Sequence, residues 1–471
     1  MNRESPRTAL VVAVVDVSLC TSITRAIRET CGADADILFA CAGEAGDFIA
    51  LRDAFSRARF VFAPPGTSAE RLRVMALRQV DADIIRFITA DASLETGGIS
   101  AAAPMSSSAI SVVVAMRNAA GTIRGTLGSL LESDLPRSSL EIVAVDDCST
   151  DGSGDIAARF VDALVRLRGR PFGPAYCRNR GVEVSHGEQI VLLDADTTLN
   201  PDTLSSLLVI AGKNPQLGGV SAAHDTFGGA ANLVSQYWNL LLRFGEHHHG
   251  GLGSYLGDGC SIVRREAIVA AGLYDEWRFT TPSLEGIELG GQLREAGFQT
   301  LLDASVSVRT LRRWSVRSAC SEAWKRSIKL ARSVGYQSVR RTAPAEIVLT
   351  LSRAAIPSIA MLCTLGLSAS LLNHSNWIAP VIGAVVGVLI GNFKVLRFFA
   401  RVRGLPFAIA VAPVHFALEV ISALGLCVGW MLRDALGDSR PDATVQAYRE
   451  VGVNRWPPVP KPRPVVGAVS G

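Results

Sequence analysis

Three long apolar runs near the C-terminus constrain this chain more than any other feature of its sequence. They span residues 354–372, 377–391 and 405–432, and only His415 and Glu419 interrupt the third. A helix needs about 20 apolar residues to cross a bilayer, so the first run is long enough, the second marginal and the third ample. A large buried helical core is the alternative, but only four residues separate the first two runs. We therefore expect a transmembrane hairpin, two or three transmembrane helices within residues 346–433, and a multi-pass location in the cell membrane.

Basic residues flank this predicted hairpin on both sides. Ten Lys and Arg residues lie within 312–353, and four more within 394–403. The positive-inside rule therefore predicts that both flanks, and the domain before them, are cytoplasmic. Segments 311–345 and 393–403 are predicted to be basic interfacial helices. The charge of the first segment either only flanks the membrane helices or forms a platform near a phosphate-bearing lipid acceptor.

The third apolar run and the tail allow further expectations. The run either crosses the membrane again or is broken by Pro413 into a re-entrant segment. His415 and Glu419 would be costly facing lipid, so both should face protein. Residues 434–471 are expected to form a Pro-rich tail without a packed core.

Charge and cysteine content exclude two classes of protein. The chain has 47 Lys and Arg against 43 Asp and Glu, a net charge of +4 over 471 residues. That is too little to bind nucleic acid through bulk charge, so no nucleic-acid partner is expected. The nine cysteines form no Cys-x-x-Cys pair, which argues against structural zinc and for reduced, mostly buried thiols.

Strand and helix patterns alternate in the middle of the chain. Strands are predicted over 110–115, 141–145 and 189–193, and helices over 122–131, around 155–164 and over 175–184. This alternation predicts an α/β fold with a parallel sheet. Ligands of such sheets bind at the carboxyl ends of the strands, and two acidic clusters stand there.

The first hundred residues repeat this plan weakly. Residues 10–15 echo 111–115, and 87–91 echo 192–196. We expect a small Rossmann-like domain over residues 1–97, which is either a decayed half-copy lacking the metal carboxylates or an unrelated α/β half. A linker rich in Gly, Ala and Ser, 96–108, then leads to the main domain over 108–310.

The acidic clusters carry the chemistry. Asp146, Asp147 and Asp151 follow one predicted strand, where carboxylates can accept hydrogen bonds from base and ribose groups. Asp194 and Asp196 stand one residue apart at the end of the next predicted strand. Their hard oxygen ligands suit Mn²⁺ or Mg²⁺, with a substrate diphosphate filling the remaining positions.

Taken together, these segments resemble the family 2 glycosyltransferases, which have the GT-A fold. The resemblance covers about residues 108–310 and continues into the membrane tail that many members carry. The matching segments are Arg117-Asn118, 146–153, 177–181 with Gly187, 194–196, 257–261, 264–267, 272–276, 284–285 and 293–297.

The resemblance implies a role for each matching site residue. The nucleotide-sugar donor would be bound by Asn118, Asp146, Asp147, Asp151, Arg178, Asn179, Asp194 and Gly259. Asp194 and Asp196 would hold the Mn²⁺ or Mg²⁺ ion. A carboxylate on a later helix would take the proton of the acceptor hydroxyl while that hydroxyl attacks the anomeric carbon with inversion.

Two departures from the family pattern affect these roles. The family usually has Glu-Asp at the base position, whereas Glu285 is followed here by Gly286. The candidate base is therefore Glu285 or, one turn later, Glu288; otherwise both face solvent and the domain is catalytically weak. The usual Pro and aromatic residue before Asn118 are also absent, so stacking on the nucleobase is expected to differ.

The sequence thus predicts a membrane-anchored, inverting, metal-dependent glycosyltransferase with a cytoplasmic catalytic domain. The donor would be a nucleoside diphosphate sugar, and the acceptor a lipid-linked or envelope glycan. A processive polysaccharide synthase is one alternative, although residues 322–326 match its Gln-x-x-Arg-Trp segment poorly. A non-catalytic nucleotide-sugar-binding membrane protein is the other. Residues 246–249, Glu-His-His-His, are expected in a mobile loop, because contiguous histidines cannot all face one metal ion.

Overall fold

The computed structural model describes residues 7–30, 36–90, 110–253, 255–276, 284–333 and 391–436. The chain divides into two compact units. Unit 1 comprises Met1–Leu208 with Cys260–Glu266, and unit 2 comprises Val209–Gly259 with Ala267–Gly471. Each unit is described below by itself.

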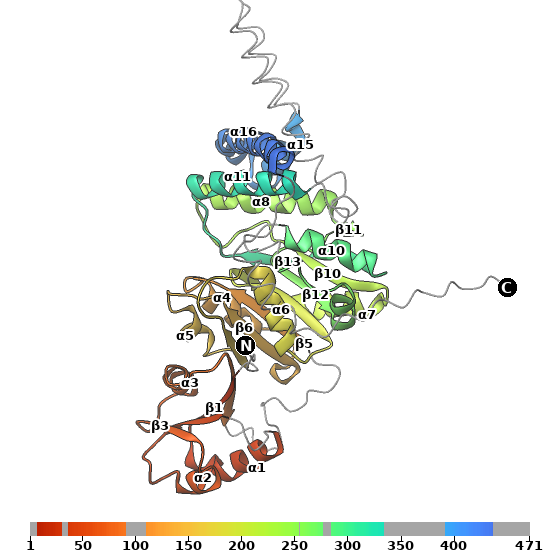
Figure 1. Cartoon of the computed structure of the whole chain (residues 1–471). Helices are drawn as coiled ribbons and strands as arrows, with labels where there is room; N and C mark the ends of the chain where they lie inside the picture. Colours follow the sequence, from red (N-terminus) through yellow and green to blue (C-terminus); the bar gives the residue numbers. More distant parts are fainter. Residues whose placement is uncertain are drawn as a thin grey trace, which may run out of the picture. The chain divides into compact units, whose positions relative to one another are not determined.

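The N-terminal half of unit 1 is a four-stranded parallel sheet with helices on both faces. Its strands are β1 (Thr8–Val14), β2 (Asp36–Ala42), β3 (Arg59–Ala63) and β4 (Ile84–Ala90), in the spatial order β4-β1-β2-β3. Its helices are α1 (Cys20–Thr30), α2 (Ile49–Ala54) and α3 (Ala69–Leu77), with a 3₁₀ turn at Val17–Leu19. Figure 1 shows α3 on the opposite side of the strands from α1 and α2. This is the doubly wound order that begins Rossmann-like sheets.

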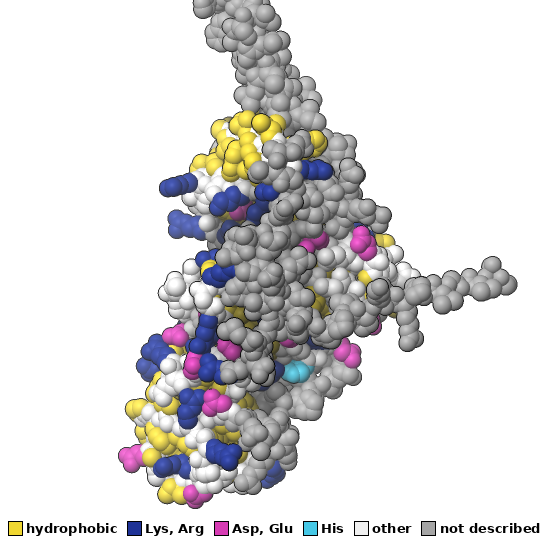
Figure 2. Space-filling model, viewed as in Figure 1, with side chains coloured by type: hydrophobic (Ala, Val, Ile, Leu, Met, Phe, Trp, Pro, Cys, Tyr) yellow, Lys and Arg dark blue, Asp and Glu magenta, His cyan; other side chains and the backbone are white. Residues whose placement is uncertain are grey.

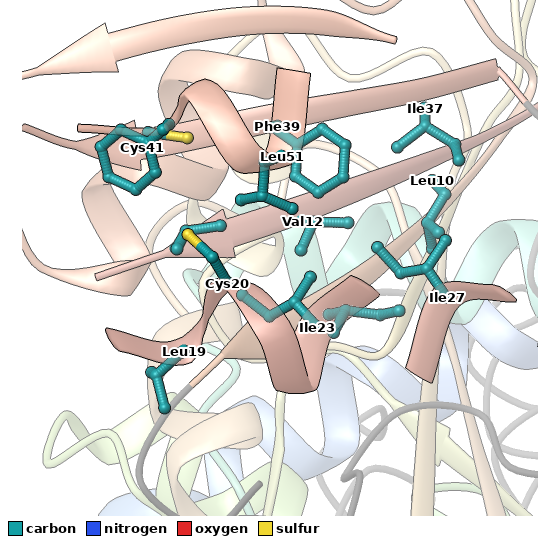
Figure 3. Close-up of a cluster of buried hydrophobic side chains, with 13 residues drawn as sticks. Leu10, Val12, Leu19, Cys20, Ile23, Ile27, Ile37, Phe39, Cys41 and Leu51 are labelled. Atoms are coloured by element: carbon teal, nitrogen blue, oxygen red, sulfur yellow. The ribbon is translucent and has the colours of Figure 1, made fainter. Parts of the chain in front are cut away.

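The core of this half lies between α1, α2 and one face of the strands. Leu10 and Val12 of β1 pack with Phe39 of β2 and with Ile23 and Ile27 of α1, and all five are buried. Figure 3 shows the α1 side chains directed at the strands. The alternate residues of β1 are buried as well, since a parallel sheet is covered on both faces.

The second half of unit 1 repeats the same strand order. Its strands are β5 (Ile110–Met116), β6 (Leu140–Asp146), β7 (Ala163–Arg166), β8 (Gln189–Asp194), β9 (Thr197–Leu199) and β12 (Cys260–Arg264). The path runs β12-β8-β5-β6-β7, parallel except for β12 against β8. Its helices are α4 (Ile123–Leu131), α5 (Ser153–Ala157) and α6 (Pro174–Val184), with a 3₁₀ turn at Arg137–Ser139. Helix α7 (Thr203–Lys213) leads from unit 1 into unit 2.

The predicted strands of this half are confirmed, whereas one predicted helix is too long. The helix expected around residues 155–164 ends at Ala157, and Ala163 already begins β7. The reason is strand pairing: Val165 bonds with Val145 of β6 on one side and faces Ile84 of β4 on the other. Tertiary pairing of this kind overrides a local helical pattern.

The two halves of unit 1 share one sheet. Strand β4 pairs antiparallel with β7, with Ile84 opposite Val165. Arg166 donates to the Val80 carbonyl at 2.6 Å, and Arg78 forms an ion pair with Asp155 at 2.9 Å. Both halves have the strand order that the predicted repeat requires. Gene duplication and a separate domain over residues 1–97 nevertheless stay predictions.

Unit 2 contains a short mixed sheet and a set of long helices. Its strands follow the order β11 (Gly251–Leu252), β13 (Gln299–Thr310) and β10 (Leu217–His224), with β10 parallel and β11 antiparallel to β13. Its helices are α8 (Leu233–His249), α10 (Glu285–Glu295), α11 (Val316–Ser333), α15 (Phe393–Arg403) and α16 (Leu405–Leu436), and α9 (Arg265–Ala270) leads into it from unit 1.

Helix α16 follows the third apolar run and is continuous through Pro413. Among the described residues it is the one helix long and apolar enough to cross a membrane. His415 and Glu419 are buried, as predicted: His415 Nδ1 lies 2.8 Å from the Tyr237 hydroxyl, and Asn392 donates to Glu419 at 2.9 Å. The run 354–372, residues 377–390 of the second run, the linker and the tail from residue 437 lie outside the described residues. The described cysteines are all free.

Candidate functional site

Three strand ends of unit 1 bring the predicted donor-site carboxylates together. Strand β5 pairs with β6 and β8 in parallel, with Met116 beside Asp146 and Ala115 beside Asp194. Both aspartates therefore flank the carboxyl end of β5. This edge is where parallel sheets bind ligands.

Asn118 ties the loop after β5 to the loop after β6. Its φ is 48°, a left-handed conformation that asparagine tolerates better than most residues. Its backbone N–H donates to Ser149 Oγ at 2.9 Å, and its side-chain carbonyl accepts from the Thr150 N–H at 2.9 Å. The side chain thus fixes the loop that borders the site.

Asp151 strengthens the same connection. Its carboxylate accepts from the backbone N–H groups of Ala120 at 2.9 Å and Ser153 at 3.0 Å, and from the Ser153 hydroxyl. Desolvation raises the pKa of Asp151, but these hydrogen bonds outweigh it and lower the pKa overall. The group is ionised at neutral pH and holds the two loops together.

Asp146 is buried at the end of β6. Burial raises its pKa, the Ser149 hydrogen bonds lower it, and the charges of Asp147 and Asp151 raise it further, with a net increase. The Ser149 N–H donates to its Oδ1 at 3.0 Å, and a Cβ added at Gly154 would stand 2.8 Å from its Oδ2. A carboxylate so enclosed is suited to accept hydrogen bonds from a bound ligand.

Asp147 holds the loop between β7 and α6. Its two oxygens accept from the N–H groups of Phe172 at 2.7 Å and Gly173 at 2.9 Å. Phe172 stacks on Tyr176 with the ring centroids 4.6 Å apart, and Arg180 lies 5.0 Å above Tyr176. Sequence reasoning missed this aromatic pair. The signal was present, because Phe172 and Tyr176 lie six and two residues before Arg178.

Asp194 is the last residue of β8 and Asp196 follows it, and helix α6 supplies a basic partner. Arg178 forms an ion pair with Asp194 at 2.7 Å, while Asn179 beside it is buried. The turn between the aspartates is fixed because Thr122 and Thr126 donate to the Ala195 carbonyl at 2.9 and 3.0 Å. The segments around Arg178 and Asp194, which the sequence analysis assigned to one site, are therefore in contact in the structure.

A divalent cation fits this donor set chemically. Asp194 and Asp196 are both half-buried and offer carboxylate oxygens, the ligands that Mn²⁺ and Mg²⁺ prefer. Within the described ranges, no group of three or more His, Cys, Asp or Glu side chains could hold a metal. The remaining ligands would have to come from the diphosphate and water, as is usual for Mg²⁺ bound with substrate phosphates.

The predicted base residues lie in unit 2, in the first turn of α10. Glu285 and Glu288 are 5 and 4 % exposed, so neither faces solvent. Burial lowers the pKa of Lys329 on α11, while the nearby carboxylates of Glu285 and Glu322 raise it. Gly259, another predicted site residue, has a φ of 91° just before β12.

Gly286, between the two glutamates, is explained by a close backbone approach. A Cβ there would stand 2.5 Å from the Leu256 carbonyl oxygen and 3.6 Å from Asp258 Oδ1. Real Cβ atoms essentially never come within 3.0 Å of backbone. The family's usual aspartate therefore cannot be accommodated at this position without moving the loop.

The histidine run is the clear error of the sequence interpretation. Residues 246–249 belong to α8 rather than to a loop. Glu246 is buried and accepts from the His224 N–H at 2.7 Å, with its other oxygen 2.6 Å from His224 Nδ1. Residues 246–249 are helical because this amphipathic helix packs on β10. The glycines that follow the helix do not prevent this packing.

Comparison with known proteins identifies the domain that carries these motifs. Residues 111–270 match the family described as glycosyl transferase family 2. This segment is therefore similar to the family 2 glycosyltransferases. The match covers β5–β8 and every predicted donor-site residue, and it stops before α10.

Curated relatives match over stretches of about a hundred residues. The succinoglycan biosynthesis protein ExoO of Rhizobium meliloti is 37% identical over 101 residues, 21% of this chain and 28% of that protein. The poly(ribitol-phosphate) beta-N-acetylglucosaminyltransferase TarS of Staphylococcus aureus is 34% identical over 98 residues, 20% of this chain and 17% of that protein. The chain thus matches under a third of the length of these relatives.

Solved structures match over a longer stretch at low similarity. A mannosyltransferase from Pyrobaculum calidifontis, in complex with GDP-Man and Mn²⁺, covers 70% of this chain and 88% of its own, at 17% identity and a TM-score of 0.41. A part of S. aureus TarS in complex with UDP-GlcNAc covers 71% of this chain and 94% of its own, at 14% identity and a TM-score of 0.36.

Proposed function

We propose that this protein is an inverting, metal-dependent glycosyltransferase that moves a sugar from a nucleoside diphosphate sugar to a lipid-linked or envelope glycan acceptor. The observation that carries the proposal is the grouping of Asp146, Asp147 and Asp194 at adjoining strand ends within a family 2 domain. The related proteins named for succinoglycan biosynthesis and for poly(ribitol-phosphate) glycosylation support an envelope acceptor.

The donor-site residues divide into two groups by what their side chains already do. Asp146 would accept hydrogen bonds from the nucleoside, because its carboxylate stands at the strand end. Asn118, Asp147 and Asp151 hold the surrounding loops, so they would keep the nucleoside pocket in shape. The Phe172 ring offers the stacking surface that the missing aromatic residue before Asn118 would otherwise supply.

Asp194, Asp196 and Arg178 would meet the diphosphate. When bound, a divalent cation would offset the diphosphate charge and assist departure of the leaving group as a Lewis acid. Arg178 is 12 % exposed and already oriented by Asp194, so its guanidinium can add a charge-assisted hydrogen bond to a phosphate oxygen. The candidates from sequence for the acceptor-side carboxylate are Glu285 and Glu288 in the first turn of α10.

The proposal is tested by nucleotide release from a panel of UDP-, GDP- and dTDP-sugars. The full chain in detergent would be given Mn²⁺ or Mg²⁺ and a native lipid extract as acceptor. We expect metal-dependent release with one donor. Nucleotide binding without turnover would favour the non-catalytic alternative, for which Gly286 is the supporting observation. Absence of both nucleotide binding and turnover would contradict the assignment of the donor site.

Membrane attachment through α16 is the second part of the proposal. Its outer face exposes Leu405, Ile409, Trp430 and Met431, with 57 to 71 % of each residue accessible. Its inner face packs on α11, α15 and α8. Figure 2 shows the hydrophobic side chains gathered over α16 with Lys and Arg side chains beside them.

The inner contacts favour an orientation in the membrane plane. Cβ atoms added at Gly425 and Gly429 would stand 3.1 Å from the Trp324 carbonyl and 2.7 Å from the Ile328 carbonyl of α11. If α16 crossed the bilayer, α11 would enter the hydrocarbon with exposed cations such as Arg317, at about 2.5–3.5 kcal/mol each. We therefore expect α16 to lie in the interface with its apolar face towards the acyl chains.

Depth measurements along α16 provide the test of this orientation. A fluorophore placed in turn at residues 409, 417, 424 and 431 should be quenched by brominated lipids at similar depths, about 5–10 Å below the headgroups. Residue 252, 66 % exposed in β11, provides the control position outside the helix. A depth profile with its maximum at the middle of α16 would show a spanning helix instead.

A further inference from the structure

Two glycines of α10 allow a loop to pass across the first turns of the helix. A Cβ at Gly286 would stand 2.5 Å from the Leu256 carbonyl oxygen, and one at Gly290 would stand 2.9 Å from the Leu256 nitrogen. The backbone at Leu256 therefore occupies the space into which side chains at 286 and 290 would project. Helix α10 therefore has no side chain at the usual base position, and the loop contacts the helix there instead.

The loop brings its own carboxylate to that position. Asp258 Oδ1 lies 3.6 Å from the point where a Cβ of residue 286 would stand, which is ordinary van der Waals distance. Asp258 is exposed, whereas Glu285 and Glu288 are buried. An acceptor hydroxyl arriving from solvent can reach the exposed carboxylate without rearrangement of α10.

Anchors on both sides fix Asp258 in place. The Gly257 N–H donates to Ser221 Oγ of β10 at 2.8 Å, and a Cβ at Gly257 would stand 3.2 Å from the Ser221 Cβ. Gly259 has a φ of 91°, which an L side chain rarely adopts, and it leads directly into β12. The hydrogen bond before Asp258 and the left-handed glycine after it thus define the local path of the backbone.

The buried Glu285 interacts with a basic residue of α11. The carboxylate of Glu285 raises the pKa of Lys329 on α11, which burial otherwise lowers. Desolvation raises the pKa of the Tyr255 hydroxyl, and the charges of Glu246 and Asp258 raise it further. Glu285 is thus a buried carboxylate whose charge acts on Lys329, while Asp258 is exposed.

We propose that Asp258 is the general base, replacing the aspartate that the family usually carries at position 286, and that Glu285 and Glu288 are positioning residues. The inference rests on the proposed function. In the reaction, the acceptor oxygen forms a bond to the anomeric carbon and its proton passes to the Asp258 carboxylate. The bond from the anomeric carbon to the diphosphate oxygen breaks, and the nucleoside diphosphate leaves with the electron pair.

Asp258→Asn is the decisive variant, because asparagine keeps the shape of aspartate but cannot accept the proton. We expect nucleotide release to fall by at least about 10²-fold, the usual contribution of a general base. The affinity for UDP or GDP, measured by calorimetry with Mn²⁺, should stay within about twofold of the wild-type value, since a base contributes to the transition state rather than to binding. Formate added to Asp258→Ala should restore part of the rate, which a purely structural role would not allow.

Glu285→Gln and Glu288→Gln are the comparison variants, assayed with the same donor and lipid extract. The assignment would be overturned if nucleotide release by Asp258→Asn fell by less than about threefold, or if this variant lost nucleotide affinity. Formate rescue of a glutamate-to-alanine variant instead of Asp258→Ala would overturn it as well. Absence of release by the wild-type protein with every donor would contradict the proposed function itself, and the base assignment with it. Normal release by wild type with an active Asp258→Asn would contradict only the base assignment.

Discussion

Asp196→Asn is expected to lower metal-dependent nucleotide release by at least about 10³-fold. Loss of a Lewis-acid ligand removes several kcal/mol of transition-state stabilisation, and about 4 kcal/mol corresponds to a factor of 10³. Asp196 is half-buried just after β8, and the fixed Ala195 carbonyl holds its backbone, so the substitution should leave the fold intact. Release should be measured with the donor that the panel selects.

Asp202→Asn provides the matched control for this prediction. Asp202 is exposed, six residues further along the same segment, and its substitution removes the same charge. We expect it to keep activity within about twofold, as surface substitutions usually do. Removal of the metal with EDTA should reproduce the Asp196→Asn defect in the wild type and weaken nucleotide binding. Full activity of Asp196→Asn would show that the motif does not act on a metal.

The central α/β part could be predicted because its signals are local. The β-branched runs at β5, β6 and β8 are long enough to identify a strand, and each of the last two ends in acidic residues. In a parallel sheet this ending alone determines where the carboxylates lie. The pairing of Asp194 with Arg178 follows from the same order, since α6 directly precedes β8.

Features that depend on distant backbone contacts escaped the sequence interpretation. Nothing local to Gly286 indicates that the Leu256 carbonyl would stand 2.5 Å from its missing Cβ. The pairing of β4 with β7, which joins the N-terminal strands to the same sheet, depends on residues far apart in sequence, such as Ile85 and Leu164. Residues 246–249 read as a loop from composition, while burial of Glu246 against His224 keeps them helical.

The glycine at position 181 illustrates how the motif and the packing depend on each other. It follows Arg178-Asn179-Arg180 on α6, and a Cβ there would stand 2.2 Å from Val113 Cγ1 of β5. Val113 is fully buried and β-branched, so its side chain has few rotamers with which to move away. Close contact of α6 with the sheet therefore requires glycine, and that contact is what places Arg178 beside Asp194.

Gly181→Ala is accordingly expected to destabilise the domain by about 2–3 kcal/mol, the upper range for adding a methyl group to a packed core. Thermal unfolding in detergent measures the change, and nucleotide affinity should fall as α6 moves Arg178 away. The double variant Gly181→Ala/Val113→Ala should be at least about 1 kcal/mol more stable to unfolding than the sum of the two single-variant effects predicts, because the two positions are in contact. Gly128→Ala on α4, where a Cβ meets nothing within 4 Å, is the control and should stabilise the helix by about 0.5–1 kcal/mol. Equal unfolding midpoints for Gly181→Ala and wild type would mean that α6 can shift freely. The need to place Arg178 beside Asp194 would then not explain why residue 181 is a glycine.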